Sequence, residues 1–280
     1  MMDLCRISMF FETPMKSSEK AFSNQLKPIY RIFWFVLGVM QTSFGQSPKE
    51  KVNLETRCLM FNGFASMVVP SGDLALDYGA YGEVGGGIQY QTKKKWIMGL
   101  EGAYMFGNGV KNDPIPNLRN PDGTVIGTNG SDAVFKVFQR ATSLPAIRFG
   151  KTFSPFKNPG HNALGGITVM AGGSWFRHWT YIQDLSKKTP QFSDSYRQGY
   201  DRLSSGPTAS LWIGYLYLPD HGKLNLHAEA GYTQAFTTTD RYDFAYSTPA
   251  GVKRNDGFFQ IRLRICFTVK SRNENSAYYY

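Results

Sequence analysis

The sequence has few cysteines, few histidines and few long apolar segments, and each shortage excludes a class of protein. Three cysteines and four histidines stand at irregular spacings, which predicts neither a metal site nor a disulfide framework. A mean hydropathy of −0.32 excludes a helical membrane protein. The glycine-rich segment 82–87, GEVGGG, lies inside a predicted strand, where glycine permits close packing and is not a phosphate-binding motif. We therefore expect no cofactor, no metal and no catalytic residues.

The one apolar run, Ile32–Gly45, has the features of an export signal. It follows Lys27 and Arg31 and ends in small residues before Gln46, which is the order of a basic region, an apolar region and a cleavage site. The run is shorter than the roughly 20 residues that a transmembrane helix needs. We predict a cleaved signal peptide over residues 1–45.

The segment Phe259–Lys270, FQIRLRICFTVK, alternates apolar and polar residues without interruption. A period of two indicates one extended strand, and this one is longer than the five or six residues of an ordinary soluble strand. Its polar face carries Arg262 and Arg264, and arginines do not enter a dry core unpaired. The pattern is typical of a strand in a membrane barrel, with the apolar face toward lipid and the polar face toward the lumen.

Seven further segments have strand character, so the predicted fold is all-β: an eight-stranded antiparallel up-and-down transmembrane β-barrel over residues 46–270, with a C-terminal tail at 271–280. Connections after the second, fourth and sixth strands are short and the next ones are long, which is typical of outer-membrane barrels. Pro145 interrupts the fourth strand and predicts a bulge. The predicted strands are 56–69, 80–91, 96–106, 134–153, 164–181, 207–218, 224–237 and 259–270, and the predicted outward loops are 107–133, 182–206 and 238–257.

Several of these features together resemble small outer-membrane β-barrel proteins of Bacteroidota. They are the signal segment that ends before Gln46, the eight-strand rhythm, and the loop sequences GTVIGTNG (123–130) and GYDRLSSGP (199–207). The wider resemblance is to barrels of the OmpA/OmpX type, and it covers nearly all of residues 50–270. It implies an integral protein of the outer membrane but attaches no activity to the loop sequences. Because ten residues follow the last strand, either Phe267 or Tyr280 is the aromatic that the barrel-assembly machinery would read.

The residues that we place on the lumen face carry both signs of charge. An eight-stranded barrel has an interior just wide enough to be filled by side chains, and buried carboxylates must be paired. The set therefore predicts a salt-bridged plug, and a narrow gated ion path is the alternative. The predicted lumen charge network is Glu83, Glu101, His227, Glu229, Arg262 and Arg264, with Arg148 as a further candidate.

Two other features invite a functional or a structural interpretation. The loop residues Tyr200, Asp201 and Arg202 either order their own loop through an Asp201–Arg202 cluster or form an epitope for a partner. Cys58 and Cys266 both fall on the lumen face near the same rim, on strands that must be neighbours in a closed barrel. They are either two unlinked thiols or a disulfide across the seam. A catalytic pairing of His178 with Ser174 is unfavourable, because two positions four apart on one strand are about 13 Å apart.

These observations favour a structural or interaction-type outer-membrane barrel that displays three long loops and has no catalytic activity. The alternatives are a narrow pore, a barrel enzyme acting on lipid A, and a soluble lipocalin-like barrel, which the inward charges oppose. The formal net charge of +10 is spread along the chain, so we expect contact with outer-membrane lipid and lipopolysaccharide and no binding of nucleic acid. Simple solvation of the surface is the alternative interpretation of this charge. An envelope protein that binds the loops is a further expected partner.

Overall fold

The alternating segment forms most of β12 (Lys253–Lys270), the last strand of the protein. This strand begins six residues before the predicted one. The structure is a computed structural model that describes residues 57–127, 130–154, 165–185, 189, 198–218, 224–243 and 248–270. The predicted signal peptide, residues 1–45, and the tail, residues 271–280, lie outside the described residues.

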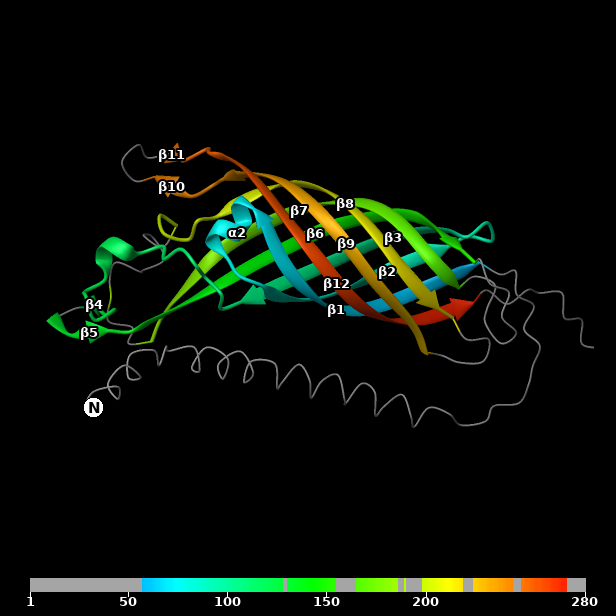
Figure 1. Ribbon diagram of the computed structural model, residues 1–280, viewed down its shortest axis with the longest axis horizontal. Coiled ribbons are helices and arrows are strands. Elements are labelled where there is room, and N and C mark those ends of the chain that lie inside the picture. The colour runs from blue at the N-terminus through cyan, green and yellow to red at the C-terminus, as the bar shows by residue number, and fades with distance from the viewer. Residues whose placement is uncertain are drawn as a thin grey trace, which may run out of the picture. The chain divides into compact units, whose positions relative to one another are not determined.

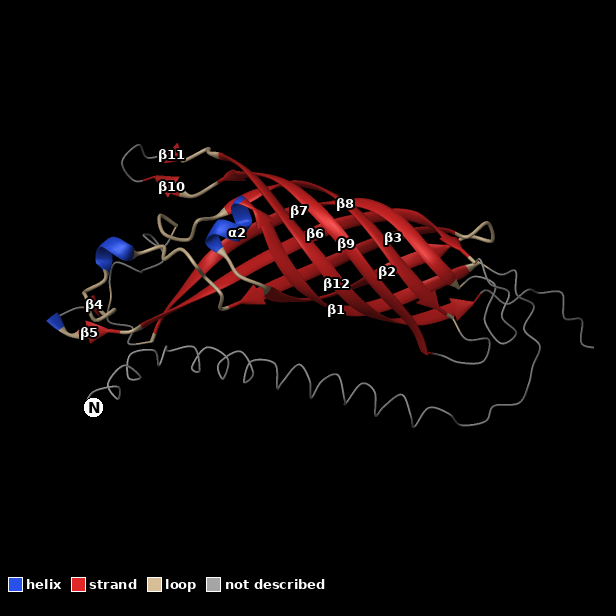
Figure 2. Cartoon of the chain, viewed as in Figure 1, coloured by secondary structure: helices blue, strands red, loops and turns tan. Residues whose placement is uncertain are grey.

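Eight antiparallel strands close into one barrel, which confirms the predicted fold class (Figures 1 and 2). Each strand pairs with its neighbour in the chain, and β1 pairs with β12 over its full length, from Cys58 opposite Lys270 to Gly72 opposite Asp256. Closure leaves no strand edge unpaired, as a barrel in lipid requires. The other barrel strands are β1 (Cys58–Gly72), β2 (Tyr81–Gln91), β3 (Trp96–Gly107), β6 (Phe135–Phe153), β7 (Gly166–Asp184), β8 (Ser204–Tyr217) and β9 (Leu224–Thr239).

The two ends of the barrel differ. One end, here called the turn end, carries the connections 92–95, 154–165 and 218–223; the other, the loop end, carries 73–80, 108–134, 185–203 and 240–252. The short elements α2, β4, β5, β10 and β11 all gather at the loop end (Figure 1). α2, a single turn of helix, was not predicted from the sequence. The bounds of the short elements are α2 (Asp73–Asp77), the 3-10 turn η1 (Pro116–Leu118), β4 (Val125–Ile126), β5 (Asp132–Ala133), β10 (Tyr242–Asp243) and β11 (Thr248–Pro249).

The predicted interruption at Pro145 is confirmed. The pairing of β6 with β7 shifts between Ser143 and Ala146, and the pairing of β3 with β6 shifts at the same place. Leu144 and Pro145 are therefore left out of both ladders. Proline has no N–H to donate to a ladder, so a bulge is the position that tolerates it.

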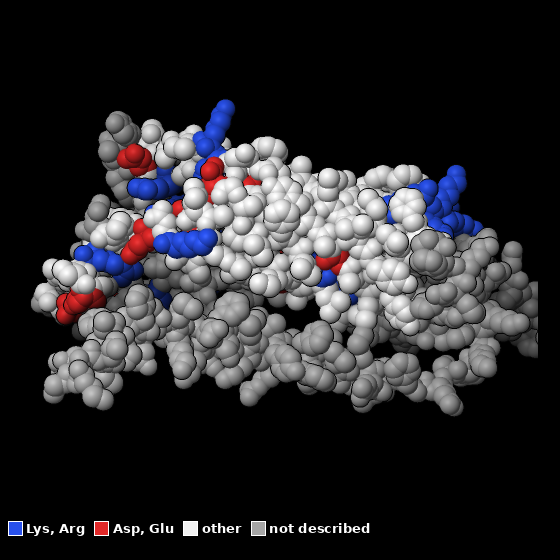
Figure 3. Space-filling view, viewed as in Figure 1, with Lys and Arg blue, Asp and Glu red and all other residues white. Residues whose placement is uncertain are grey.

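The outer wall of the barrel is apolar over its middle, and this surface, here called the apolar belt, makes the fold a transmembrane barrel. Ile261 is 73% exposed and Leu211 is 68% exposed, whereas soluble monomers rarely expose large contiguous apolar patches. On the face shown in Figure 3, charged side chains gather at the two ends of the barrel and leave its middle almost free of them. No helix among the described residues is long and apolar enough to cross a membrane. The exposed apolar residues of the belt include Phe61, Met67, Val84, Ile88, Met98, Leu100, Leu144, Ile147, Phe149, Val169, Ile213, Phe236, Leu263 and Phe267.

Candidate functional site

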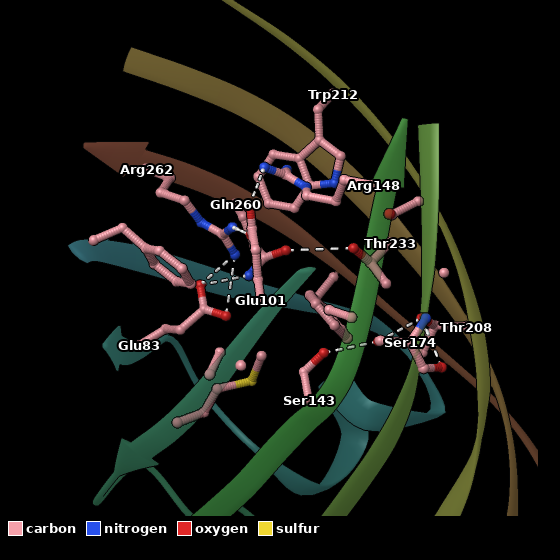
Figure 4. Close-up of a pocket in the computed structure, with 18 residues that line it drawn as sticks. Glu83, Glu101, Ser143, Arg148, Ser174, Thr208, Trp212, Thr233, Gln260 and Arg262 are labelled. Carbon is pink, nitrogen blue, oxygen red and sulfur yellow. Dashed lines mark hydrogen bonds and ion pairs between the residues drawn. The ribbon is translucent and has the colours of Figure 1, made fainter. Parts of the chain in front are cut away.

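Seven charged or ionisable side chains meet in the middle of the barrel and form a buried ion-pair cluster, here called the lumen network. Glu101 accepts from Arg264 at 2.6 Å and from Arg262 at 3.1 Å. Glu229 accepts from Arg264 at 2.8 Å and from Arg148 at 3.0 Å. Figure 4 shows Glu83, Glu101, Arg148 and Arg262 pointing toward one another from different walls of the barrel. The members of the lumen network are Glu83, Glu101, Arg148, His227, Glu229, Arg262 and Arg264.

The structure therefore brings together all six predicted lumen residues and Arg148, the further candidate. The period of two on each strand explains why they face inward. It does not explain their pairing. Arg262 stands opposite Glu229 in the register of β9 and β12. Its guanidinium instead reaches past β1, on the other side of β12, to Glu83 of β2 at 3.0 Å and to Glu101 of β3.

The formal charges of the lumen network balance, with three arginines against three glutamates. His227 also belongs to the lumen network. Its Nδ1 is 3.4 Å from Glu229, and its Nε2 is 2.8 Å from Thr168 Oγ1. The guanidinium groups also lie on aromatic rings: Arg262 is 3.9 Å from the centroid of Phe64. A buried ion pair survives only with good geometry and further hydrogen bonds. Arg264 has such a bond, to Asn62 at 2.7 Å, whereas Nη2 of Arg148 and Nε of Arg262 are buried with no hydrogen-bond partner among the described residues.

Apolar layers close the lumen on both sides of the network. Toward the loop end, rings from Tyr81, Phe176 and Phe258 pack with Met105 and Val68. Toward the turn end, a second buried cluster fills the bore; its members are Cys58, Met60, Ile97, Met170, Trp212, Leu216, Leu218 and Cys266.

A small cavity of about 30 Å³ separates the network from the loop-side layer, enough for one or two water molecules. The hydroxyls of Ser143, Ser174 and Thr208 line one side of it (Figure 4). Among the described residues, the interior is thus filled at three successive levels.

A second ionic cluster, here called the loop-end clamp, ties the connections at the loop end to the barrel. Asp77, which ends α2, accepts from Arg254 of β12 at 2.8 Å and from Arg202 at 3.1 Å. Asp256 accepts from Arg254 at 3.2 Å and lies 3.1 Å from His178 Nε2. This cluster was not predicted from the sequence. One feature of the sequence could have indicated it: Asp256 continues the inward alternation of β12 beyond the predicted start of the strand.

The loop candidates Tyr200, Asp201 and Arg202 do not act as one cluster. The guanidinium of Arg202 donates to Asp77 and to the carbonyls of Asn112 and Asp113. Asp201 instead accepts the backbone N–H of Leu203, which makes a local turn. The expected Asp201–Arg202 pairing is therefore wrong, because each side chain has a different partner.

Tyr200 packs against a small apolar cluster of the loop end. That cluster consists of Ile115, Val125, Ala133, Phe135 and Ile182, with Leu118 at its edge.

Of the two alternatives for Cys58 and Cys266, the seam disulfide is wrong. Cys58 and Cys266 are both buried and face inward on neighbouring strands, but no disulfide joins them. The register explains this: Cys58 stands opposite Lys270, and Cys266 stands opposite Asn62. The offset of four residues corresponds to roughly 13 Å along the strand, whereas a disulfide needs Cα atoms within about 7 Å.

The histidines form no catalytic or metal-binding arrangement in the part of the chain that the structure covers. The imidazole of His178 forms a hydrogen bond with Asp256, and the hydroxyl of Ser174 forms hydrogen bonds with those of Ser143 and Thr208. No group of three potential ligands for a metal occurs within the described ranges. His161 and His221 lie outside them.

No protein-family model matches the chain, and no curated protein matches it. Three solved structures illustrate what it is similar to. Ail of Yersinia pestis shares 10% identity at a TM-score of 0.39, with 77% of this chain and 99% of that one covered. Neisserial surface protein A shares 10% identity at a TM-score of 0.37, with 75% of this chain and 96% of that one covered. The outer membrane protein OprG of Pseudomonas aeruginosa shares 12% identity at a TM-score of 0.30, with 78% of this chain and 96% of that one covered. Values of this size transfer no role to this chain, and none of these structures bears on a Bacteroidota origin.

Proposed function

We propose that the protein is an integral outer-membrane β-barrel that displays an ordered loop platform, with a structural or interaction role and no catalytic activity. The observation that carries the proposal is the loop-end clamp. Asp77 lies on the connection between β1 and β2, Arg202 on that between β7 and β8, and Arg254 on β12, so their ion pairs join three separate parts of the loop end. The carbonyls of Asn112 and Asp113 bring in a fourth.

The loop end also contains its own small apolar core, which supports the same proposal. Ile115, Val125 and Ile182 are almost fully buried there, and the β4–β5 hairpin contributes Val125 and Ala133. A loop that only linked two strands would not need a packed interior. A surface that is ordered before it meets a partner loses less conformational entropy on binding.

The location is tested by site-specific proteolysis on intact cells. A protease site inserted at 120–123, in the loop end, should be cut from outside, whereas the same site at 93–95, in the turn end, should be protected until the outer membrane is broken. Cutting of both sites, or of neither, in intact cells would contradict the proposed orientation.

The role as a displayed surface is tested with the clamp. Exchanging Asp77 for Ala should leave the barrel folded but should make the loop connections sensitive to added protease, because two arginines lose their shared carboxylate. Lys93→Ala, at the opposite end, is the matched control and should leave loop cleavage unchanged. A partner of the envelope should then bind the wild type and the control better than the Asp77→Ala variant.

The filled interior opposes the pore alternative, and planar-bilayer recordings decide it. We expect no reproducible unitary currents from the purified protein; steady conductance would refute the structural role. The lipid A enzyme alternative predicts a change in lipid A mass when the protein is expressed, and we expect none.

A further inference from the structure

A hollow on the outer wall of β3, β6 and β7 lies at the border between the apolar belt and the loop end. Two arginines and three aromatic residues line it: Arg140, Arg177, Tyr104, Trp179 and Tyr181. Arg140 stands directly opposite Trp179 in the register of β6 and β7. Both arginines alternate with buried neighbours, so their side chains face outward.

The height of these arginines along the barrel is set by the belt. Trp175, two residues before Arg177, is 51% exposed, and Leu144, four residues after Arg140, is 63% exposed. One strand rise is about 3.3 Å, so the guanidinium groups lie within reach of the edge of the hydrocarbon layer. Tyrosine and tryptophan side chains are enriched at this level of a membrane, where an apolar ring meets a polar headgroup.

Neither arginine has a carboxylate partner among the described residues. Arg140 donates only to the carbonyl of its neighbour Gln139, at 3.3 Å, and lies over the Phe138 ring. By contrast, Arg148, Arg202, Arg254, Arg262 and Arg264 are each held in ion pairs.

The acidic residue of the hollow is Asp201. Burial raises the pKa of this carboxyl, and the nearby charges of Arg177 and Arg241 oppose that rise. Its Oδ1 accepts the N–H of Leu203, and no ion pair within 4 Å joins it to Arg177. The hollow thus contains two arginines and one carboxylate, and that carboxylate accepts a hydrogen bond within its own turn. The hollow therefore has a net positive charge.

We propose that this hollow binds a phosphate group of lipopolysaccharide in the outer leaflet. Arg140 and Arg177 donate to the phosphate oxygens, since the planar guanidinium matches phosphate geometry. Tyr104, Trp179 and Tyr181 contact the sugar ring and the first carbons of the acyl chains. The apolar belt directly below the hollow favours an anchored lipid over free phosphate, because it contacts the acyl chains at the same time. The inference rests on the proposed location in the outer membrane.

The test measures lipid binding to the mature chain, refolded in detergent micelles, by native mass spectrometry. The probe is lipid A that carries both phosphates. The test variant is Arg140→Gln/Arg177→Gln, and the matched control is Lys93→Gln/Lys94→Gln, which removes two exposed cations at the turn end. We expect the dissociation constant for lipid A to rise at least about tenfold in the arginine variant and less than about twofold in the lysine control.

Two further probes separate the sources of phosphate. Lipid A without phosphates should bind the wild type as weakly as the arginine variant binds the complete lipid, and millimolar inorganic phosphate should not displace lipid A. Equal affinities of the wild type and the arginine variant, equal losses in both variants, or displacement by inorganic phosphate would each overturn the proposal. If the Gln variant does not refold, Arg140→Lys/Arg177→Lys replaces it and should weaken binding by about threefold to tenfold, and an affinity equal to that of the wild type would again overturn the proposal.

These binding results do not depend on where the protein resides in the cell. Failure of the proposed location would appear as the wrong membrane fraction with lipid A binding intact. Failure of the hollow would appear as correct fractionation with no phosphate-dependent binding.

Discussion

Replacing Arg264 by Met is the sharpest test of the lumen network. The side chain is fully buried and donates to Asn62 at 2.7 Å, to Glu101 at 2.6 Å and to Glu229 at 2.8 Å. Met has a similar length and no charge. The substitution therefore removes a donor from two buried carboxylates, Glu101 and Glu229, and leaves the lumen network one positive charge short. Breaking a buried ion pair by removing one partner costs about 3–5 kcal/mol, and we expect a loss of this size in the free energy of unfolding.

The loss is measured by urea unfolding of the refolded protein in lipid vesicles, followed by tryptophan fluorescence and by the gel mobility of the folded form. Lys253→Met, on the same strand but exposed to solvent, is the control and should change stability by less than about 0.5 kcal/mol. The double variant Arg264→Met/Glu101→Gln should be more stable than the sum of the two single losses predicts, because it removes one charge of each sign. A single-variant loss below about 1 kcal/mol would refute the view that the network is tightly coupled.

Three other expectations follow from the structure. Ile265→Arg should reduce folding yield in micelles more than Thr268→Arg, because a cation facing lipid costs about 2–4 kcal/mol near mid-bilayer, and equal yields would contradict the assigned facing. Cys58 and Cys266 should react with a maleimide only after unfolding, with no reductant needed, since both are buried and no disulfide joins them; labelling of the folded barrel would count against their place in the packed lumen. Asp256 accepts hydrogen bonds from His178, Thr237 and Arg254 at the loop end of β12. Acid that protonates this carboxylate removes the acceptor of these bonds, so the protection factors of the amides at 253–256, corrected for the intrinsic exchange rate at each pH, should fall from pH 5 toward pH 2, and unchanged protection would contradict this assignment.

The sequence by itself determined the architecture and the facing of most strands. Strict alternation on β12 identifies which residues meet lipid and which meet the lumen, since the side chains of a strand alternate regardless of its neighbours. The same rule assigns Glu101, His227 and Glu229 to the interior, and the missing N–H of proline places the bulge at Pro145.

The tertiary structure decided which inward residues meet. The register of the closed barrel separates Cys58 from Cys266 by four positions, and nothing local in either strand fixes that offset. Closure also brings Asp77 to Arg254, which are 177 residues apart. It places Arg262 within reach of Glu83, past β1, and away from Glu229, its neighbour in register. Alternation is a property of one strand, whereas pairing depends on how eight strands tilt and shift together when the sheet closes.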